Sequence, residues 1–311
     1  MVQKSSLKPK LLIIAGPTCS GKSQLSINLA KKYNGEIISC DSMQIYKGCN
    51  IATAKIKSDE MQGVKHYMLD VVNPTEKFSV SEYKVMAEKC INDVLKMGKL
   101  PILVGGTGLY IEAIIKDFNF KNVGKSEIIR KKYQDFLQNH TKEELFDILK
   151  QKNIDMANKI DCNNVKRVIR ALEVIELGYD GIEENRQSKY DYLYCVLNRD
   201  RIKLYQAINN RVDVMVNNGV VDEVQSLLSN GVTFENQCMQ SIGYKEWQNY
   251  LQGSEDKSIV IEKIKQNTRR YAKRQLTWFK HRDNVVFYDV DSKEDMAQLE
   301  KNISSWLYNN N

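Results

Sequence analysis

The chain has 311 residues, of which 42% are hydrophobic and 27% charged, the composition of an ordinary globular protein with a large core. It contains no apolar run of about 18 residues, and the apolar run after its basic start is too short for a signal peptide, so we expect a cytoplasmic protein without membrane contact. The formal net charge of +7 has functional meaning only if the basic residues cluster.

Cysteine and histidine spacing excludes two further classes. The seven cysteines are an odd number, and no two have CxxC spacing, which argues against a disulfide framework and a zinc module. The three histidines are too scattered to suggest a metal site.

The first 120 residues alternate short buried strands with helices. We predict strands at 10–15, 36–40 and 100–106, and helices at 23–33, at 80–98 and from 107 onward. Such alternation predicts a parallel sheet with helices on both faces.

The pattern changes near residue 120. Residues 125–189 are charged and helical with few strand signals. Beyond them we predict strands at 190–198 and 284–290, helices at 201–219, 220–231, 241–251 and 257–282, and a frayed tail at 308–311. We therefore expect an α/β core from 1–120 and 190–311, and a mostly helical insertion domain at 121–189.

A phosphate-binding motif follows the first predicted strand. The sequence GPTCSGKS matches GxxxxGK[ST] in full, with Gly16, Pro17, Thr18, Cys19, Ser20, Gly21, Lys22 and Ser23. Its backbone N–H groups can cradle phosphate oxygens, the lysine adds charge, and the last serine can hold Mg²⁺. The alternative is a chance match, but the order of strand, loop and helix favours a P-loop core that binds a diphosphate or triphosphate.

Two other strand ends carry polar residues. Asp41 follows the strand at 36–40, and the strand at 100–104 ends in GGTG, which includes Thr107, where a kinase or hydrolase usually has an acidic residue for Mg²⁺. Because ligands bind at the carboxyl ends of parallel strands, we expect Asp41 and Thr107 near the bound phosphates.

Basic residues cluster between Lys263 and Arg282, a stretch without Asp or Glu in which aromatic residues are interleaved. On a helix, Arg270, Lys273 and Arg274 lie on one side. Such a face suits an RNA backbone, although a solvated helix surface is the alternative.

Six motifs occur in the order typical of one family: GPTCSGKS (16–23), DSMQIYKGCNIATAK (41–55), GGTGLYI (105–111), KRVIRALEV (166–174), QSIGYKE (240–246) and TRRYAKRQLTWF (268–279). Together they resemble the tRNA dimethylallyltransferases, also called tRNA isopentenyltransferases. Three residues depart from the family's pattern. Cys19 replaces a small residue, Ala52 a glycine, and Tyr67 a frequent second histidine, so no role is carried over to His66.

The resemblance implies that dimethylallyl diphosphate binds in the phosphate loop with Mg²⁺ on Ser23, and that N6 of a tRNA adenosine next to the anticodon is the acceptor. Asp41 would accept the N6 proton; its alternative role is as a ligand of Mg²⁺ or of the loop serine. By family position Arg211 would stabilise the leaving diphosphate, with a solvated helix charge as the alternative. Thr107 would bond the donor or N6, or cap the following helix.

The resemblance also implies an RNA-binding surface. The flipped adenosine would face Asp41, Ser42, Met43 and Gln44. The insertion domain would clamp the anticodon stem-loop. The implied tRNA contacts there are Arg130, Lys166, Arg167, Val168, Ile169 and Arg170, to which the helix near the C-terminus adds Arg270, Lys273 and Arg274.

Three other functions share parts of this pattern. A P-loop kinase for a small metabolite shares the motif and the fold. A prenyltransferase acting on free AMP or ATP shares the donor site, but needs neither the basic helix nor the insertion. A non-catalytic RNA-binding protein would not need the intact set Lys22, Ser23, Asp41 and Thr107. We see no self-association motif and expect a monomer.

Overall fold

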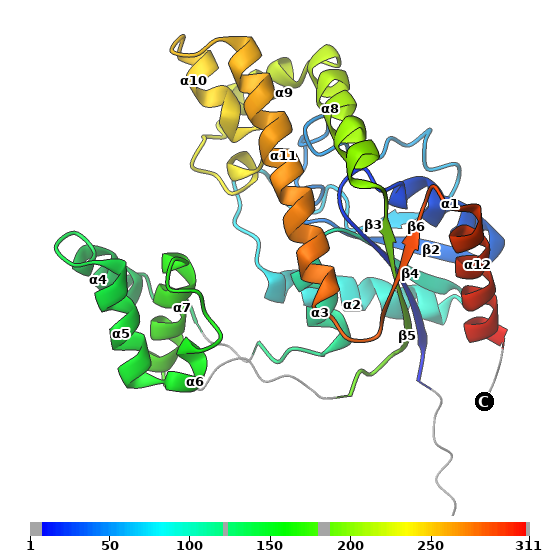
Figure 1. The fold of residues 1–311 in the computed structure, drawn as a ribbon, viewed down its shortest axis with the longest axis horizontal. Coiled ribbons are helices and arrows are strands. Elements are labelled where there is room, and N and C mark those ends of the chain that lie inside the picture. Colours follow the sequence, from blue (N-terminus) through cyan, green and yellow to red (C-terminus); the bar gives the residue numbers. More distant parts are fainter. Residues whose placement is uncertain (1–7, 121–123, 180–186, 309–311) are drawn as a thin grey trace, which may run out of the picture. The chain divides into compact units, whose positions relative to one another are not determined.

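The computed structural model describes residues 8–120, 124–179 and 187–308, so parts of the predicted insertion and the Asn309–Asn311 tail lie outside the described residues. The chain divides into two compact units (Figure 1). We call Met1–Ile115 with Ser188–Asn311 the α/β unit, and Lys116–Gln187 the helical unit. Within the described ranges no helix combines the length and apolarity that crossing a membrane requires.

The α/β unit is built on a six-stranded sheet in the order β3-β2-β4-β1-β5-β6. All neighbouring strands pair in parallel, which confirms the predicted sheet. The strands are β1 (Lys10–Ala15), β2 (Gly35–Cys40), β3 (His66–Tyr67), β4 (Leu100–Gly105), β5 (Asp191–Asn198) and β6 (Val285–Asp289). The central strands are apolar along nearly their whole length because helices cover both of their faces.

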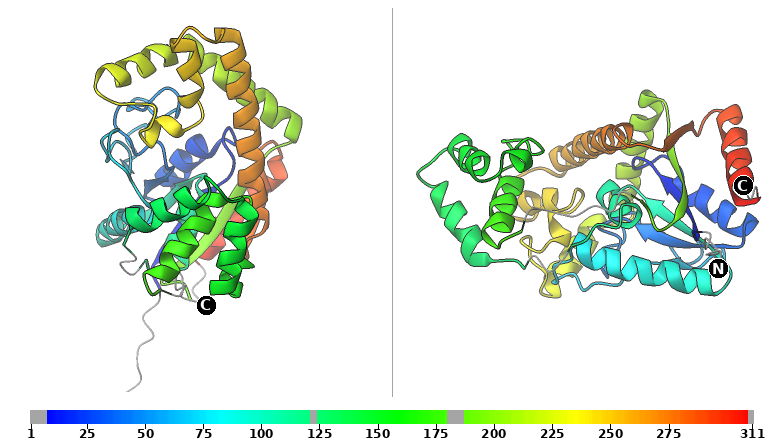
Figure 2. Two further views of the ribbon diagram at one scale, coloured as in Figure 1. Left: turned by 90° about the vertical axis from the view of Figure 1, so that its left-hand side faces the viewer. Right: turned by 90° about the horizontal axis from the view of Figure 1, so that it is seen from below.

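Alternate residues of each strand point into two separate hydrophobic clusters. Leu12 and Ile14 of β1 pack with α1 (Lys22–Lys32) and α12 (Lys293–Tyr308). Leu11 and Ile13 pack into the larger cluster on the other face. The helices that contribute to that cluster are α2 (Val80–Lys96), α3 (Gly108–Ile115), α8 (Arg201–Asn217), α9 (Val220–Ser229) and α11 (Lys257–Lys280). Figure 2 shows α12 beside α1 in further views.

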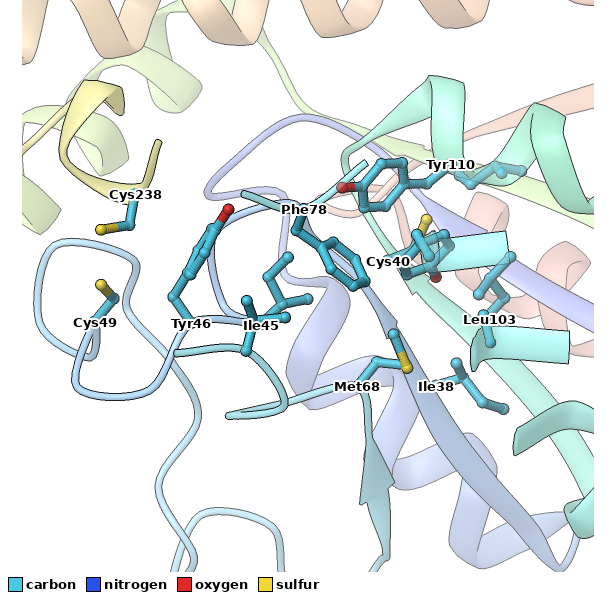
Figure 3. Packing of buried hydrophobic residues seen from close by; sticks show 14 of the residues in the cluster. Ile38, Cys40, Ile45, Tyr46, Cys49, Met68, Phe78, Leu103, Tyr110 and Cys238 are labelled. Carbon is cyan, nitrogen blue, oxygen red and sulfur yellow. The ribbon is translucent and has the colours of Figure 1, made fainter. Parts of the chain in front are cut away.

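The segment after β2 is an ordered part of the core although it has almost no regular secondary structure. Ile45, Tyr46 and Cys49 are buried in the larger cluster. Figure 3 shows Tyr46 near Phe78, and Cys49 facing Cys238 of the short 3₁₀-helix η1 (Cys238–Gln240). These anchors fix the segment as it passes the end of the sheet.

Three details differ from the sequence expectation. Residues 241–251 form a 3₁₀ turn, η2 (Lys245–Trp247), and the short helix α10 (Gln248–Leu251) instead of one helix, since Gly243 has a φ of +95° that interrupts it. The two-residue edge strand β3 and the helix α12 were not predicted. The last helix covers the sheet with Leu299 and Ile303, and it extends to Tyr308, where a frayed tail was expected.

In the described residues of the helical unit, four helices surround a small core of their own. They are α4 (Glu127–Phe136), α5 (Lys142–Lys152), α6 (Ile154–Ala157) and α7 (Val165–Glu176). Each begins at a polar N-cap whose side chain accepts a backbone N–H, for example Ser126 before α4 and Asn164 before α7. Tyr133, Leu149 and Leu172 lie in the core of this unit.

Candidate active site

A cavity of about 520 Å³ lies at the carboxyl edge of the sheet, within the α/β unit. Its walls come from the loops after β1 and β2, the end of β4, and the helices α8 and α11. The cavity brings together Lys22, Ser23, Asp41 and Arg211, which are far apart in the sequence. This is the edge at which parallel sheets of this type bind ligands.

The phosphate loop has the backbone geometry that its glycines permit. Gly16 has a φ of +147°, and a Cβ at this position would lie 2.5 Å from the carbonyl oxygen of Leu197. Gly21 has a φ of +82° and leads directly into α1. Between them Cys19 is also left-handed, with a φ of +63°. Such a succession of turns directs backbone N–H groups toward a common anion.

Lys22 and Arg211 are two neighbouring cations that line the cavity. The Nζ of Lys22 donates to the Pro17 carbonyl (2.5 Å) and to Ser20 Oγ (3.4 Å). Burial, and then the nearby positive charge of Arg211, lower the pKa of Lys22 to about 8. Within the described residues neither side chain has an ion pair. An anion bound between them would relieve their repulsion.

Arg211 is held by the segment after β2. Its Nη2 donates to the carbonyl oxygen of Thr53 (3.0 Å), and Gln44 Nε2 donates to the same oxygen (3.2 Å). Both Arg211 and Gln44 line the cavity.

Asp41 and Thr107 lie beside each other because β2 and β4 are neighbours, with Cys40 opposite Gly105. The Asp41 Oδ1 accepts backbone N–H groups from Met43 (2.8 Å) and Gln44 (3.3 Å). Its Oδ2 accepts none within the described part of the chain. The hydroxyl of Thr107 accepts the N–H of Ser42 (3.2 Å), so it ties the two strand ends together rather than capping α3.

Sequence reasoning missed two site residues on α11, Tyr271 and Gln275. The buried Gln275 accepts the Thr18 N–H (3.0 Å) and donates to the Gly106 carbonyl (3.0 Å), which joins the phosphate loop to the end of β4. Tyr271 lines the cavity; burial and then the charge of Asp41 raise its pKa above the usual range. A polar residue four positions before the buried Phe279 was the signal that could have identified Gln275.

The outer face of α11 carries the predicted basic cluster. Arg270, Lys273 and Arg274 are exposed and have no ion pair within the described residues. The Arg274 guanidinium lies 5.6 Å from the Tyr271 ring centroid and also reaches the cavity. By contrast, Lys265 near the start of the stretch pairs with Asp213 (2.9 Å).

The predicted RNA contacts of the helical unit are not all on its surface. Val168 and Ile169 are buried in the core of the unit, so the side chains on the surface of this segment are those of Lys166, Arg167 and Arg170.

Arg130 and Arg170 of this unit share one buried carboxylate. Glu173 accepts Arg130 Nε and Nη2 (both 3.0 Å) and Arg170 Nη1 (2.6 Å). The backbone N–H of Ser126 is a further donor to it (2.7 Å). Arg130 and the Ser126 N–H therefore hold α4 against α7, whereas Arg170 pairs with Glu173 within α7.

The residues at the cavity also fit a magnesium ion. The Ser23 hydroxyl is exposed to the cavity beside Lys22, and the Asp41 carboxylate lines the same space. Oxygen atoms are the ligands that Mg²⁺ prefers, and the ion commonly takes only one or two from protein when it binds with phosphates.

Known proteins resemble this chain over nearly its whole length. A model of the IPP transferase family matches residues 44–282. The chain is 44% identical to a tRNA dimethylallyltransferase of Thermoanaerobacter sp. (strain X514) over 306 residues, which cover 96% of this chain and 97% of that protein. It is 43% identical to a tRNA dimethylallyltransferase of Oceanobacillus iheyensis, with 92% of each chain covered.

Solved structures show the same fold. A tRNA isopentenylpyrophosphate transferase of Bacillus halodurans has a TM-score of 0.74 at 41% identity, covering 96% of this chain and 97% of that one. A eukaryotic dimethylallyltransferase acting on tRNA has a TM-score of 0.80 at 30% identity, covering 97% of this chain and 80% of that one. The chain therefore belongs to the tRNA dimethylallyltransferase (IPP transferase) family.

Proposed function

We propose that this chain transfers the dimethylallyl group of dimethylallyl diphosphate to N6 of the tRNA adenosine on the 3′ side of the anticodon, position 37, and releases diphosphate. Dimethylallyl transfer to tRNA is the activity of the family to which the chain belongs. The observation that carries the proposal is one cavity lined by the carboxylate Asp41 and by two cations, Lys22 and Arg211, that have no ion pair in the described part of the chain.

The cationic side of the cavity suits the donor. The backbone N–H groups of the phosphate loop, Lys22 and Arg211 would bind the diphosphate and stabilise the charge that it gains as it leaves. Ser23 would hold Mg²⁺, and when bound this ion would neutralise part of the diphosphate charge.

The acidic side suits the acceptor. The N6 amine is a poor nucleophile because its lone pair is delocalised into the purine ring. As the bond from N6 to the dimethylallyl carbon forms and the carbon–oxygen bond to diphosphate breaks, Oδ2 of Asp41 would take the N6 proton. The bonds from Met43 and Gln44 to Oδ1 hold this carboxylate in place, and Thr107 keeps the neighbouring strand ends together.

The basic face of α11 suits the tRNA backbone. Arg270, Lys273 and Arg274 would bind phosphates, with Lys166 and Arg167 as further contacts on the helical unit. Because N6 is inaccessible in a stacked loop, the adenosine would flip toward Asp41. We expect the enzyme to act as a monomer in the cytoplasm, where tRNA is available.

The competing functions are less well supported. The matches with tRNA-modifying transferases extend over nearly the whole chain, including the helical unit and α11, which a small-molecule kinase does not need. Transfer to free AMP would leave the exposed cations of α11 without a role.

Transfer from labelled dimethylallyl diphosphate with Mg²⁺, to tRNA and in parallel to free AMP, tests the proposal. We expect label on an N6-prenylated adenosine at position 37 after nucleoside analysis and sequencing. Equal labelling of AMP would favour the nucleotide acceptor. ATP consumption without any prenylated product would favour the kinase.

A further inference from the structure

A single carboxylate on α9 holds the segment that contacts Arg211. Glu223 Oε2 accepts the backbone N–H groups of Asn50 (2.9 Å) and Ile51 (2.7 Å). Its Oε1 accepts the N–H of Ala52 (3.2 Å) and the hydroxyl of Tyr244 (2.6 Å). Three consecutive backbone donors thus converge on one side chain that is about 170 residues away in the sequence.

The next residue of this segment is the one that contacts the proposed catalytic arginine. The Thr53 carbonyl accepts both Arg211 Nη2 (3.0 Å) and Gln44 Nε2 (3.2 Å). The Thr53 hydroxyl donates to the Cys49 carbonyl (2.7 Å), which closes the turn. The position of the Thr53 carbonyl therefore depends on the turn that Glu223 holds.

The beginning of the segment is anchored in the hydrophobic core, and the backbone N–H groups that follow converge on an anion. Tyr46 and Cys49 anchor its beginning in the hydrophobic core (Figure 3). After Cys49, three N–H groups point to one place, as in the backbone concavities that bind anions. A carboxylate satisfies all of them with charge-assisted bonds, which are about twice as strong as neutral ones. An amide would turn its own N–H groups toward at least one of these donors.

We propose that Glu223 is a positioning residue for the transfer reaction: by fixing residues 50–53 it sets the Thr53 carbonyl that holds Arg211 against the donor's diphosphate. The inference rests on the proposed function of Arg211. Glu223 itself contacts neither substrate, so its effect passes through Arg211.

The test is a double-mutant cycle of Glu223→Gln and Arg211→Ala, read as the single-turnover rate of dimethylallyl transfer to tRNA. Misplacing a catalytic group by about 1 Å can slow a reaction by roughly 100-fold. We expect Glu223→Gln to slow transfer by about 10- to 100-fold in the otherwise native chain, with tRNA affinity unchanged. In the Arg211→Ala background the same substitution should have almost no effect.

Glu82→Gln is the matched control. Glu82 also accepts a backbone N–H, that of Ser79 (2.8 Å), in the same unit, but it does not line the cavity. We expect this variant to keep the native rate.

Tyr244→Phe is a second variant that leaves the carboxylate and its three backbone donors in place. It removes the hydroxyl bond to Glu223 and the contact of the same hydroxyl with the Cys49 thiol. We expect a loss of about threefold in rate, again only when Arg211 is present.

The outcomes separate the two proposals. An equal slowing by Glu223→Gln with and without Arg211 would overturn the positioning role while leaving the proposed function intact. A native rate in Arg211→Ala alone would contradict the function assigned to Arg211, and with it the inference. If the Glu223→Gln variant does not fold, the double-mutant cycle of Tyr244→Phe and Arg211→Ala replaces it. Additive losses of transfer rate in that cycle would overturn the positioning role.

Discussion

The cations of the cavity and those of the helical unit differ in what they bind. In the cavity, Lys22 and Arg211 donate to backbone carbonyls and have no ion pair within the described residues. In the helical unit, Arg130 and Arg170 converge on Glu173, which is completely buried. Both groups were predicted to bind an anionic substrate; the second already shares one carboxylate between two guanidinium groups.

The pKa values of the charged groups differ between the two regions in the same way. Burial alone would raise the pKa of Glu173, but hydrogen bonds from Arg130, Arg170 and Ser126 outweigh it and leave this pKa below the usual range. The pKa of Lys22 instead falls to about 8, because burial and Arg211 oppose its charge. Paired charges stabilise their unit, whereas the cations of the cavity are placed to take up an anion such as the diphosphate of the proposed donor.

The largest effect is expected at Asp41, the carboxylate that lines the cavity together with Lys22 and Arg211. Replacing Asp41 by alanine should reduce transfer by about 10²- to 10⁴-fold, the contribution typical of a general base, and leave tRNA binding nearly intact. Single-turnover rates and filter binding to tRNA would measure the two quantities. A loss of binding as large as the loss of rate would show that Asp41 is mainly structural.

A smaller loss is expected when one cavity cation is removed. Lys22→Ala should lower kcat/KM for the donor by about 10²- to 10³-fold, the effect of losing one group that stabilises developing charge. Arg167→Ala, which removes an exposed cation of the helical unit, should leave donor kinetics unchanged. Native donor kinetics in Lys22→Ala would exclude the phosphate loop as the donor site.

The next prediction concerns the exposed cations of α11, whose charge can be reversed by substitution. Arg270→Glu with Arg274→Glu should weaken tRNA binding about 100-fold and reduce the slope of log affinity against log salt by about 0.7 to 0.9 for each lost phosphate contact. Lys293→Glu with Lys301→Glu on α12 makes the same charge change elsewhere as a control. An unaltered salt slope would mean that the α11 face is only solvated.

The paired cations should affect stability more than activity. Glu173→Gln should lower the free energy of unfolding by about 1 to 3 kcal/mol, since it removes a charged acceptor that several donors share. A carboxyl with a lowered folded-state pKa stabilises the protein above its unfolded-state value of 4.5, and this contribution is lost as pH falls through the folded-state pKa. Urea unfolding at pH 7 and at a pH below the folded-state pKa of Glu173 should show a difference between variant and native chain only at pH 7.

The sheet and the phosphate loop were predictable because their signals are local. A buried strand, a glycine-rich turn and a helix follow one another within residues 10–32, and each leaves its own pattern. The role of Glu223 could not be predicted, since its partners lie in another part of the sequence and are backbone groups. The helix α12 was missed because only two of its residues, Leu299 and Ile303, are fully buried.

The sequence also does not distinguish the arginines that pair with Glu173 from an arginine that stays exposed. Arg130 and Arg170 carry the same charge as Arg270 and occupy similar helical patterns, and only the fold shows which of them meet Glu173.

The pH dependence of kcat/KM for dimethylallyl diphosphate, at saturating tRNA, tests most directly whether Lys22 binds the donor. The protonated lysine is the binding form, and its pKa of about 8 in the free cavity predicts that kcat/KM falls as pH rises through this value. Arginine stays protonated in this range, so Lys22→Arg should have a lower maximum but no such fall. The same fall in both enzymes would contradict the account, because it would place the titrating group elsewhere.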